Sequence, residues 1–556
     1  MRDYVGIANQ YIDDVLSGEV VACQFVTLAC ERQRRDLALE NFAYTFDEDL
    51  ASYVCKFVEL LPHVKGVWAR KRELITLEPW QIFILTTVFG WIDADGLRRF
   101  KTVYTEIPRK NGKSAISSGV GLYMLAADGE AGAEVYSAAT TRDQAKIVWD
   151  VAKSMAEKTK GLQQRFGVNT SSHSIFVEHN NSVFKPLSRD QGGNHDGYSV
   201  SCGIIDELHA HNTRDIFDVI ETGTGSRDQP LLWLITTAGT NRAGICYEQR
   251  GYLVKILNGG HVDNEYFGII FTIDDGDDWT DPTVWEKANP NWGKSVKPDD
   301  IARKARKAME TPSAVNNFLT KHLNVWCNAA TAWMDMRVWD GCAERLSMDD
   351  FKDYECYMGL DLAEKRDIAA LSILFRRDNT VYSFGKYYLN EERVEQSGNS
   401  QFSGWQKSGH LIVNDGNITD FDLIANDIKE ICNTFSVKAV AYDPAKSQYF
   451  AVKLFGDGIP MVQFVQSARN YTTPFIELEN LVYGDEFRFD GNPALTWMIS
   501  NVMAKTSQFS GLVHPVKEGE ENKIDGAMAL LMALGEMMDE AEDQQSVYED
   551  RGIRSL

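Results

Sequence analysis

Apolar and polar residues alternate along the chain with two different periods, which together predict an α/β protein. From Tyr104 to Gly239, short apolar runs alternate with segments whose apolar residues recur every three to four positions. The short runs have the pattern of buried strands, and the spaced segments have the period of amphipathic helices. Because strands that alternate with helices form parallel sheets through crossover connections, we expect one here. The predicted strands include TVYTEI, AEVYSAA, VSCGIIDE and PLLWLITTA, and the helix TTRDQAKIVWDVAKSMAEKT lies between two of them.

A second sheet is predicted in the carboxy-terminal half. YECYMGLDLA, DIAALSILFR and TVYSFGKYYL follow one another with only short turns between them, which favours an antiparallel meander. The helix FDLIANDIKEICNTF, the strands KAVAYD and MVQFV, and the helix IDGAMALLMALGEMM come after it. Residues 240–330 are predicted to be mostly helix and loop. The expected organisation is a helical region at 1–55, a first domain at 56–330, a linker at 331–350, a second domain at 351–540 and an acidic tail at 541–556.

Composition narrows the class of protein. A chain of 556 residues is too long for one core, and 44% hydrophobic with 25% charged residues is typical of globular proteins. The sequence lacks an apolar run long enough for a membrane span, and its start is not signal-like. Nine cysteines without CxxC pairs favour a reducing compartment and argue against structural zinc. His209 and His211 are interpreted as two loop histidines rather than as a metal site.

The net charge of −23 argues against a surface covered by basic nucleic-acid-binding residues. Local patches can still hold DNA, and carboxylates that bind metal ions add negative charge for a different reason. Composition alone therefore leaves the partner open.

The stretch IPRKNGKS, residues 107–114, has the length and the setting of a phosphate-binding loop that lacks its first glycine. It follows a predicted strand and precedes a predicted helix, whose amino end attracts anions. Gly112 permits a tight backbone, Lys113 can contact the β- and γ-phosphates of ATP, and Ser114 can reach Mg²⁺. Arg109, Lys110 and Asn111 of the same loop are also predicted to bind ATP, and the first two add positive charge.

Two later strands end in residues that fit the same predicted ATP site. VSCGIIDE ends in Asp206 and Glu207, which places one carboxylate beside magnesium and the next beside the attacking water. LLWLITTAG ends in Thr236, Thr237 and Gly239, where hydroxyl groups can sense the γ-phosphate. Upstream, EPWQ offers the amide of Gln81 to an adenine edge, although a Trp-Gln pair that opens a helix is also a structural feature.

Three aspartates at the edges of elements predict a second site, for metal-dependent cleavage of phosphodiesters. Asp361 lies inside an apolar strand, where an unpaired charge is unfavourable. Asp443 lies at the end of another strand, and Asp525 begins an apolar helix. Converging carboxylates bind Mg²⁺ or Mn²⁺. Asp443 before proline also fits a turn, Asp525 also fits a helix N-cap, and Asp367 is a candidate fourth acid.

IPRKNGKS, IIDELHAH and ITTAG, preceded by EPWQ, resemble the ATPase half of tailed-bacteriophage large terminase subunits over about residues 75–330. The resemblance implies a P-loop (RecA/ASCE-like) core with an additional strand, in which TTAG couples hydrolysis to movement. It also implies an arginine finger, for which Arg109, Arg142 and Arg227 are the candidates.

Residues 351–538, above all KIDGAMALLMALG, resemble the ribonuclease-H-like nuclease of the same family. By this resemblance Asp361, Asp443 and Asp525 are the nuclease metal ligands.

The resemblance implies a motor that uses ATP and Mg²⁺ to move double-stranded DNA into a procapsid, and a nuclease that cuts the DNA with Mg²⁺ or Mn²⁺. The implied partners are a portal protein and a small terminase subunit, with the chain acting as a homo-oligomeric ring. The implied location is the host cytoplasm, transiently at the portal vertex and outside the mature virion.

Three alternatives stand beside this interpretation. A superfamily-2 helicase or translocase would need a second RecA-like lobe. A capsid-associated protein that binds nucleotide without hydrolysing it would not need the Asp206-Glu207 pair. A repair nuclease would leave the phosphate loop unexplained.

Overall fold

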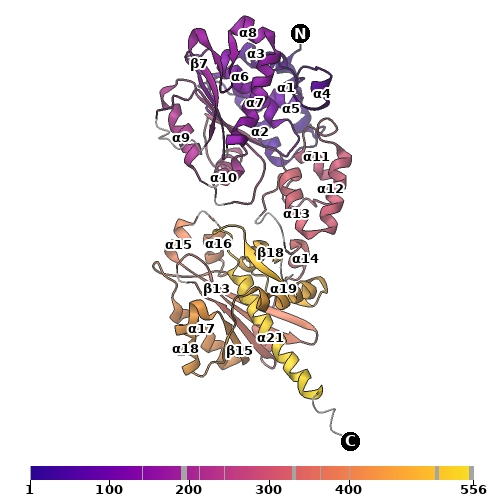
Figure 1. Ribbon diagram of the computed structural model, residues 1–556, viewed down its shortest axis with the longest axis vertical. Coiled ribbons are helices and arrows are strands. Elements are labelled where there is room, and N and C mark those ends of the chain that lie inside the picture. The colour runs from indigo at the N-terminus through magenta and orange to yellow at the C-terminus, as the bar shows by residue number, and fades with distance from the viewer. Residues whose placement is uncertain are drawn as a thin grey trace. The chain divides into compact units, whose positions relative to one another are not determined.

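The computed structural model describes residues 2–140, 142–188, 197–211, 213–242, 244–327, 333–363, 365–397, 399, 401–506 and 512–549. The chain forms two compact units (Figure 1). Unit 1 comprises Met1–Met309 and Asn317–Cys327, and unit 2 comprises Glu310–Asn316 and Asn328–Leu556. Among the described residues, no helix combines the length and the apolar composition that a membrane span requires.

Unit 1 is built on an eight-stranded sheet that confirms the predicted parallel architecture. Its strands are β3 (Thr102–Glu106), β4 (Glu134–Ala139), β5 (Val168–Thr170), β6 (Ile175–Val177), β7 (Ser182–Ser188), β8 (Cys202–Asp206), β9 (Leu231–Thr236) and β10 (Tyr266–Ile270). The order is β10-β3-β9-β8-β4-β7-β6-β5, and every pair from β10 to β7 is parallel. β10 lies in the region that was expected to be mostly helix and loop. Its sequence, YFGII, is a short apolar run without flanking alternation, and its pairing with β3 makes it a strand.

Helices cover the sheet of unit 1, and the amino-terminal helices belong to the same core. They are α1 (Tyr4–Ser17), α2 (Gln24–Leu37), α3 (Glu48–Glu59), α4 (Gly66–Arg70), α5 (Pro79–Gly90), α6 (Lys113–Ala126), α7 (Arg142–Lys158), α8 (Lys160–Phe166), α9 (Asp215–Gly223), α10 (Ile245–Leu257), α11 (Trp285–Ala288) and α12 (Pro298–Glu310). The next helix, α13 (Pro312–Phe318), is divided between the two units, and its residues up to Asn316 belong to unit 2. A small sheet pairs β1 (Thr45–Phe46) with β2 (Trp91–Ile92). α5 is buried along nearly its whole surface, and α1 and α3 pack against it. Residues 1–55 therefore share the core of unit 1, because the apolar α5 must be covered on all sides.

Unit 2 contains the predicted meander within a mixed sheet. Its strands are β11 (Glu355–Asp361), β12 (Ala369–Arg377), β13 (Thr380–Asn390), β14 (Ile412–Asn414), β15 (Ser436–Tyr442), β16 (Met461–Gln463), β17 (Phe487–Phe489), β18 (Val502–Thr506) and β19 (Val513–Lys517). The order is β14-β13-β12-β11-β15-β16, and β17 also pairs with β13. β11, β12 and β13 are antiparallel, whereas β15 is parallel to β11 and β16 to β15. β18 and β19 form a separate hairpin.

The helices of unit 2 lie on both faces of its sheet. They are α14 (Met336–Gly341), α15 (Glu391–Gln396), α16 (Gln401–Lys407), α17 (Phe421–Thr434), α18 (Pro444–Gly456), α19 (Ala468–Tyr483), α20 (Pro493–Ser500) and α21 (Asp525–Glu549). Residues of α19, α20 and α21 share one core with Tyr357 of β11, and residues of α17 and α18 share another core with Met358 and Leu360. Since side chains alternate along a strand, Gly359 and Asp361 are on the same face as Tyr357, toward α21.

Two predicted boundaries of unit 2 differ from the structure. The expected linker at 331–350 contains α14, whose Trp339 is fully buried in the unit 2 core beside Phe487 and Phe489. α21 runs to Glu549, past the expected domain end at 540, and residues 550–556 lie outside the described part of the chain.

The closest approach of helix and sheet in unit 2 occurs at Gly359. A Cβ atom at this position would lie 2.0 Å from the carbonyl oxygen of Ala529 and 2.7 Å from the backbone nitrogen of Ala533. Neither backbone atom can move without the helix. Gly359 therefore sets the distance between β11 and α21, and with it the distance between the strand that ends in Asp361 and the helix that begins at Asp525.

We expect Gly359→Ala to lower the free energy of unfolding of the full chain by about 1–3 kcal/mol, because α21 must shift to admit the methyl group. Urea unfolding measures the effect. Gly404→Ala is the matched control: its Cβ meets nothing within 4 Å, and alanine favours the helix in which it lies. Equal unfolding midpoints for Gly359→Ala and the parent protein would contradict the close contact.

Candidate functional site

The first candidate site lies where three neighbouring strands of unit 1 end. β9 lies between β3 and β8, and the three are parallel and in register. Glu106 pairs with Thr236, and Asp206 pairs with Ile235. The segments that follow these strands therefore leave the sheet at the same edge. This is the additional-strand arrangement that the resemblance implied.

The phosphate-loop residues form a tight turn into α6. Gly112 caps this helix with a φ of 86°, a left-handed conformation that glycine adopts without strain. Lys110 is also left-handed, with a φ of 74°. Arg109 and Lys110 are exposed, while Lys113 at the first helical position is buried. No side chain caps α6, so the backbone N–H groups of its first turn are available to an anion.

Three asparagines, which we call the asparagine clamp, hold this loop from the side: Asn111, Asn289 and Asn291. The Asn111 Nδ2 atom donates to Asn289 Oδ1 at 3.1 Å. Asn291 donates from its backbone nitrogen to Asn111 Oδ1 and from Nδ2 to the Asn111 carbonyl, at 3.1 and 3.0 Å. Ser295 adds a hydrogen bond to the Lys110 carbonyl at 2.6 Å. Sequence reasoning missed the clamp, although the run Asn-Pro-Asn in a Pro/Asn/Gly/Trp-rich segment was its visible signal.

Gln81 and Trp80 approach the loop from α5. The Gln81 Oε1 atom accepts from the Glu78 nitrogen at 2.9 Å and so completes a capping box, which is the structural role that was left open for this residue. Its Nε2 atom would lie 3.4 Å from a Cβ atom on Gly112. Trp80 donates from Nε1 to Asn291 Oδ1 at 2.8 Å, which connects α5 to the clamp.

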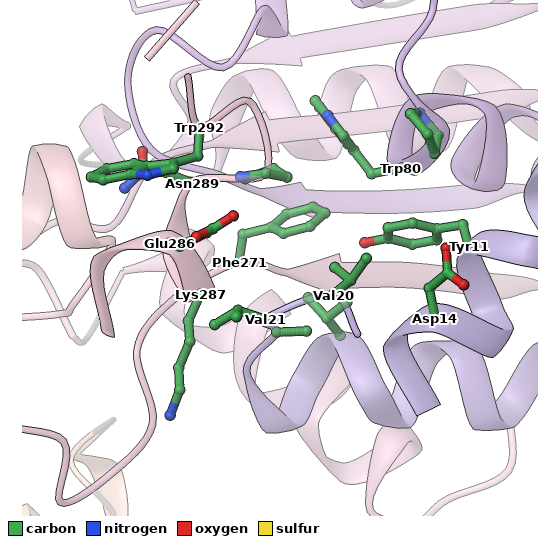
Figure 2. A pocket seen from close by; sticks show the side chains of 14 residues that line it. Tyr11, Asp14, Val20, Val21, Trp80, Phe271, Glu286, Lys287, Asn289 and Trp292 are labelled. Carbon is green, nitrogen blue, oxygen red and sulfur yellow. The ribbon is translucent and has the colours of Figure 1, made fainter. Parts of the chain in front are cut away.

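A cavity of about 190 Å³ adjoins the clamp (Figure 2). Its aromatic walls are Tyr11, Trp80, Phe271 and Trp292, and its polar lining includes Asp14, Glu286 and Lys287. None of the loop residues 107–114 lines it. The cavity is therefore distinct from the phosphate loop and meets it only through Trp80 and the clamp.

Lys113, Asp206 and Glu207 come together at the sheet edge. Lys113 Nζ lies 3.4 Å from Glu207 Oε1, and the Glu207 nitrogen donates to Asp206 Oδ1 at 2.9 Å. Burial, followed by the charge of Glu207, raises the pKa of Asp206 to about 6 against the opposing effect of Lys113. Glu207 has a left-handed backbone, with a φ of 50°. That conformation turns the chain away from the strand directly after Asp206, so the two carboxylates leave it in different directions.

His209 and Lys321, neither of them predicted as a site residue, complete this cluster. His209 Nδ1 lies 3.2 Å from Glu207 Oε2, and Lys321 Nζ lies 3.1 Å from His209 Nε2. Burial opposes the ionisation of Glu207, but the His209 hydrogen bond and the charge of Lys113 outweigh it and hold the pKa of this carboxyl well below its usual range. Burial and the neighbouring Arg109 lower the pKa of Lys321. Glu207 is thus an ionised carboxylate with the Lys113 ammonium group on one side and the His209 ring on the other.

The predicted coupling residues touch the same cluster. Thr236 and Thr237 are fully buried. Thr236 Oγ1 accepts from the His209 nitrogen at 3.0 Å, and Thr237 Oγ1 donates to Glu207 Oε2 at 3.4 Å. A Cβ atom on Gly239 would lie 3.0 Å from the Cβ of His209. A movement of the Glu207 side chain therefore affects Thr237, directly after β9, through this hydrogen bond.

The arginine-finger candidates differ in their placement. Arg227 lies at the opposite edge of the sheet, before β9, where it contacts Glu130 at 3.0 Å and three backbone carbonyls. Its guanidinium is held by these partners at that edge, away from the phosphate loop of its own chain. Arg109 lies in the loop itself. The side chain of Arg142 lies outside the described part of the chain.

The second candidate site lies at the centre of the unit 2 sheet. β11 and β15 are parallel neighbours with Leu360 opposite Tyr442, so Asp361 and Asp443 come next to each other at the carboxyl edge. Gln466 Nε2 donates to Asp361 Oδ1 at 3.1 Å. Asp443 also caps α18, with Oδ1 accepting from the Ala445 nitrogen at 3.2 Å. Burial, followed by the charges of Asp361 and Asp443, raises the pKa of Tyr471 well above its ordinary value.

Asp525 begins α21 among a different set of charges. Burial, followed by the charge of Asp367, raises the pKa of Asp525 to about 6. Asp367 is paired with Lys523 at 2.6 Å and with Lys517 at 3.4 Å. Asp367 is therefore engaged by lysines, and its predicted role as a fourth metal ligand competes with these ion pairs.

Among the residues that the structure describes, no group of three or more His, Cys, Asp and Glu side chains stands in metal-binding geometry. The structure thus places Asp361 beside Asp443 but does not bring Asp525 into one ligand cluster with them. One observation still fits a divalent cation: the Asp525 Oδ2 atom is buried without a hydrogen-bond partner. A buried carboxylate oxygen without a donor is unfavourable, and a cation satisfies it.

Comparisons with known proteins agree with both halves of the chain. The family model described as terminase large subunit, ATPase domain, matches residues 79–255, and that described as terminase large subunit, endonuclease domain, matches residues 261–541. The endonuclease match begins inside unit 1 and includes β10, which pairs with β3.

Similar proteins come from a bacterium and from a bacteriophage. Protein YmfN of Escherichia coli (strain K12) is 38% identical over 391 residues, which is 66% of this chain and 84% of that protein. The terminase large subunit of Enterobacteria phage HK97 is 26% identical over 460 residues, 81% of this chain and 89% of the relative. The crystal structure of the HK97 large terminase matches with a TM-score of 0.44 and 24% identity, covering 87% of this chain and 99% of that one.

The second lobe required by a helicase is not present in the described part of unit 2, whose sheet is centred on an antiparallel meander. The ATPase and endonuclease domains together indicate ATP hydrolysis, DNA cleavage and the use of a nucleotide and divalent metal ions. The chain belongs to the terminase large subunit family, and it is a viral DNA-packaging motor subunit with an ATPase domain and an endonuclease domain.

Proposed function

We propose that the loop from Pro108 to Ser114 holds the triphosphate of ATP, with Lys113 on the β- and γ-phosphates. Ser114 and Asp206 would hold Mg²⁺, which neutralises phosphate charge and orients the reacting oxygens. Glu207 orients the attacking water and accepts its proton. The observation that carries this proposal is the contact between Lys113 Nζ and Glu207 Oε1 at 3.4 Å, directly beside Asp206.

The nucleobase is proposed to lie beside Gln81. The capping box uses the Gln81 oxygen and leaves its Nε2 donor near Gly112, so this amide can donate to a ring nitrogen of adenine. Arg109 remains a candidate for the arginine finger, together with Arg142.

Asp361, Asp443 and Asp525 are proposed to bind Mg²⁺ or Mn²⁺ in the endonuclease domain. Asp361 and Asp443 support this through their adjacent strand ends, and Asp525 supports it through its unpaired Oδ2 atom. The cation supplies an activated water and stabilises the leaving oxygen. Gln466 fixes the orientation of Asp361.

The proposed substrate is double-stranded DNA, and the proposed partners are a portal protein and a small terminase subunit. In this proposal, several copies of the chain form a ring at the procapsid portal in the host cytoplasm. A net charge of −23 opposes non-specific binding of DNA by the free subunit, which is consistent with DNA being held mainly in that assembly.

Glu207→Gln is expected to abolish ATP turnover, because the amide cannot accept the proton of water while it keeps the shape of the side chain. Phosphate release from the purified full chain measures this, and plasmid nicking in Mn²⁺ or Mg²⁺ should remain within about twofold of the parent. Loss of both activities in a folded variant would show that the two sites are not separable. Glu48→Gln, at an exposed helix start, is the control.

Asp361→Asn is expected to give the opposite result. Nicking should fall by at least about a hundredfold, since a neutral amide is a poor ligand for Mg²⁺ and Mn²⁺. ATP turnover should persist. Asp349→Asn, at an exposed position in the same unit, is the matched control. Nicking that survives in Asp361→Asn with either metal would remove Asp361 from the proposed ligands.

Asn291→Ala is expected to raise KM for ATP about tenfold, which corresponds to about 1.4 kcal/mol, because the loop loses the hydrogen bonds that hold it. Steady-state phosphate release over a range of ATP concentrations measures KM. Asn258→Ala, at the exposed end of α10, should leave it unchanged. An unchanged KM in Asn291→Ala would mean that the clamp does not shape the nucleotide site.

A further inference from the structure

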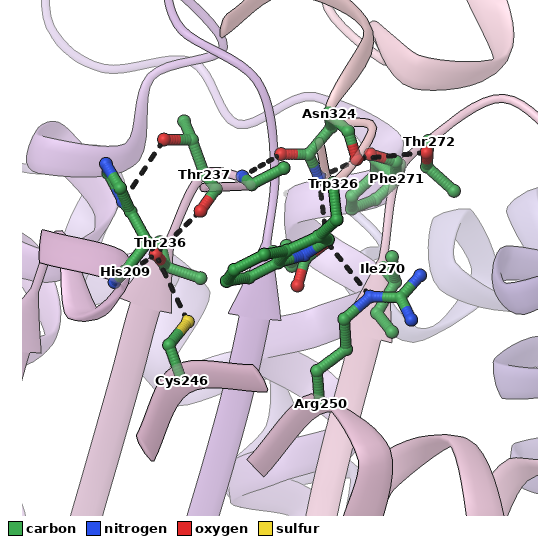
Figure 3. A network of polar contacts seen from close by, with 12 residues as sticks. His209, Thr236, Thr237, Cys246, Arg250, Ile270, Phe271, Thr272, Asn324 and Trp326 are labelled. Carbon is green, nitrogen blue, oxygen red and sulfur yellow. Dashed lines mark hydrogen bonds and ion pairs between the residues drawn. The ribbon is translucent and has the colours of Figure 1, made fainter. Parts of the chain in front are cut away.

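The segment through which the chain leaves unit 1 is attached to the end of β9. Residues 324–327 are the last of unit 1 in sequence. Asn324, the first of them, is fully buried and has a left-handed backbone, with a φ of 59°. We call Asn324–Cys327 the exit segment. Figure 3 shows Asn324 and Trp326 beside Thr236 and Thr237 at the strand ends.

The side chain of Asn324 joins the ends of two strands and reaches a third. Its Oδ1 atom accepts from the Ala238 nitrogen, directly after Thr237, at 2.7 Å. Its Nδ2 atom donates to the Phe271 carbonyl, directly after β10, at 2.7 Å. The same Nδ2 lies 3.5 Å from Glu106 Oε1 at the end of β3. One buried amide therefore fixes the spacing of β9 and β10 at the edge where the phosphate loop begins.

Glu106 provides the second attachment. This carboxylate is fully buried one residue before the phosphate loop, and neither proposed reaction uses it. It accepts from Trp326 Nε1 at 3.2 Å and from the Tyr104 hydroxyl at 2.6 Å, and Arg250 Nε lies 3.4 Å away. A buried carboxylate that loses its donors is strongly unfavourable, so these contacts resist separation.

Backbone contacts extend the connection to the phosphate loop and the coupling residues. The Cys327 nitrogen donates to the Gly239 carbonyl at 3.2 Å. The Arg109 nitrogen donates to the Lys321 carbonyl at 3.0 Å, shortly before the exit segment. A Cβ atom on Gly239 would lie 3.3 Å from Trp326 Cζ3. A shift of Thr236–Gly239 therefore cannot occur without a response of the exit segment.

We propose that Glu106, Asn324 and Trp326 are positioning residues that transmit the state of the nucleotide site from the end of β9 to the exit segment. The proposal rests on ATP binding at the phosphate loop. The path runs from Glu207 through Thr237 and Ala238 to Asn324, and from the start of the loop through Glu106 to Trp326. None of the three residues is among those proposed to bind the nucleotide. Their effect is on where the chain is held as it passes from unit 1 to unit 2.

The test follows the Cys327 amide, whose hydrogen bond to Gly239 reports on the attachment. Hydrogen exchange of the full chain is measured by mass spectrometry with ADP and with a non-hydrolysable ATP analogue. In the parent protein, exchange at 325–327 is expected to differ by at least about fivefold between the two nucleotides, because opening of this bond depends on the position of Gly239. Binding of each nucleotide is measured separately. A chain that does not bind the analogue refutes ATP binding at the loop, whereas bound nucleotide with unchanged exchange refutes the transmission.

Two variants isolate the attachment. Asn324→Gly removes the amide while glycine keeps the left-handed backbone without strain, and Trp326→Phe removes the indole N–H while keeping a ring. Both are expected to retain KM for ATP within about twofold and to lose the nucleotide-dependent difference at 325–327. Asn181→Gly, at an exposed left-handed asparagine with a φ of 59°, and the exposed Trp68→Phe are the controls.

A variant that keeps the full difference in exchange would overturn the role of its residue. If Asn324→Gly unfolds, the result for Trp326→Phe alone decides whether the proposal stands. This smaller change removes only the hydrogen bond from the indole to Glu106. A general loss of packing would raise exchange with both nucleotides in peptides throughout unit 1. The proposal instead requires a change that is confined to the response to nucleotide.

Discussion

The parallel, in-register pairing of β3, β9 and β8 is the constraint on which the ATPase unit depends. Glu106, Thr236 and Asp206 come from distant parts of the sequence, and only this pairing makes them end together. Each strand then gives the site one kind of group: a phosphate loop, a pair of hydroxyls and a pair of carboxylates. Because β9 separates the other two strands, any movement of Thr236–Gly239 affects both neighbours. Through its position, β9 connects Thr236–Gly239 to the strand that precedes the phosphate loop and to the strand that ends in Asp206.

The endonuclease unit uses the same principle with a different sheet. Asp361 ends β11, Asp443 follows the neighbouring parallel strand β15, and Asp525, the third acid in the proposal, begins α21. The spacing there is set by Gly359, where the backbone of α21 approaches β11 too closely for any side chain. In unit 1 the corresponding approach is made by side chains, through the asparagine clamp. In unit 2, the missing side chain of Gly359 sets the spacing of the site. In unit 1, hydrogen bonds between the amides of the asparagine clamp do so.

Features governed by local sequence could be predicted, and those governed by distant contacts could not. The strand ends near Asp206 and Thr236 follow from short apolar runs that end in polar residues, whereas the run around Asp361 continues and hid the end of β11. The asparagine clamp joins residues that are far apart in the chain, so the Asn-Pro-Asn run alone did not show that it contacts Asn111. β10 became recognisable as a strand only through its pairing with β3. Arg227 precedes β9 and therefore lies at the opposite edge of the sheet from the phosphate loop of its own chain, which the sequence alone did not show. Lys321 and His209 have ordinary local surroundings, and only the fold brings them to Glu207.

The ion pair between Lys113 and Glu207 joins two groups for which different roles are proposed. In the proposed arrangement, the ammonium group contacts phosphate and the carboxylate contacts water. A bound triphosphate would then compete with Glu207 for the same ammonium group. Under that proposal, one lysine couples the binding of the triphosphate to the release of the carboxylate for hydrolysis.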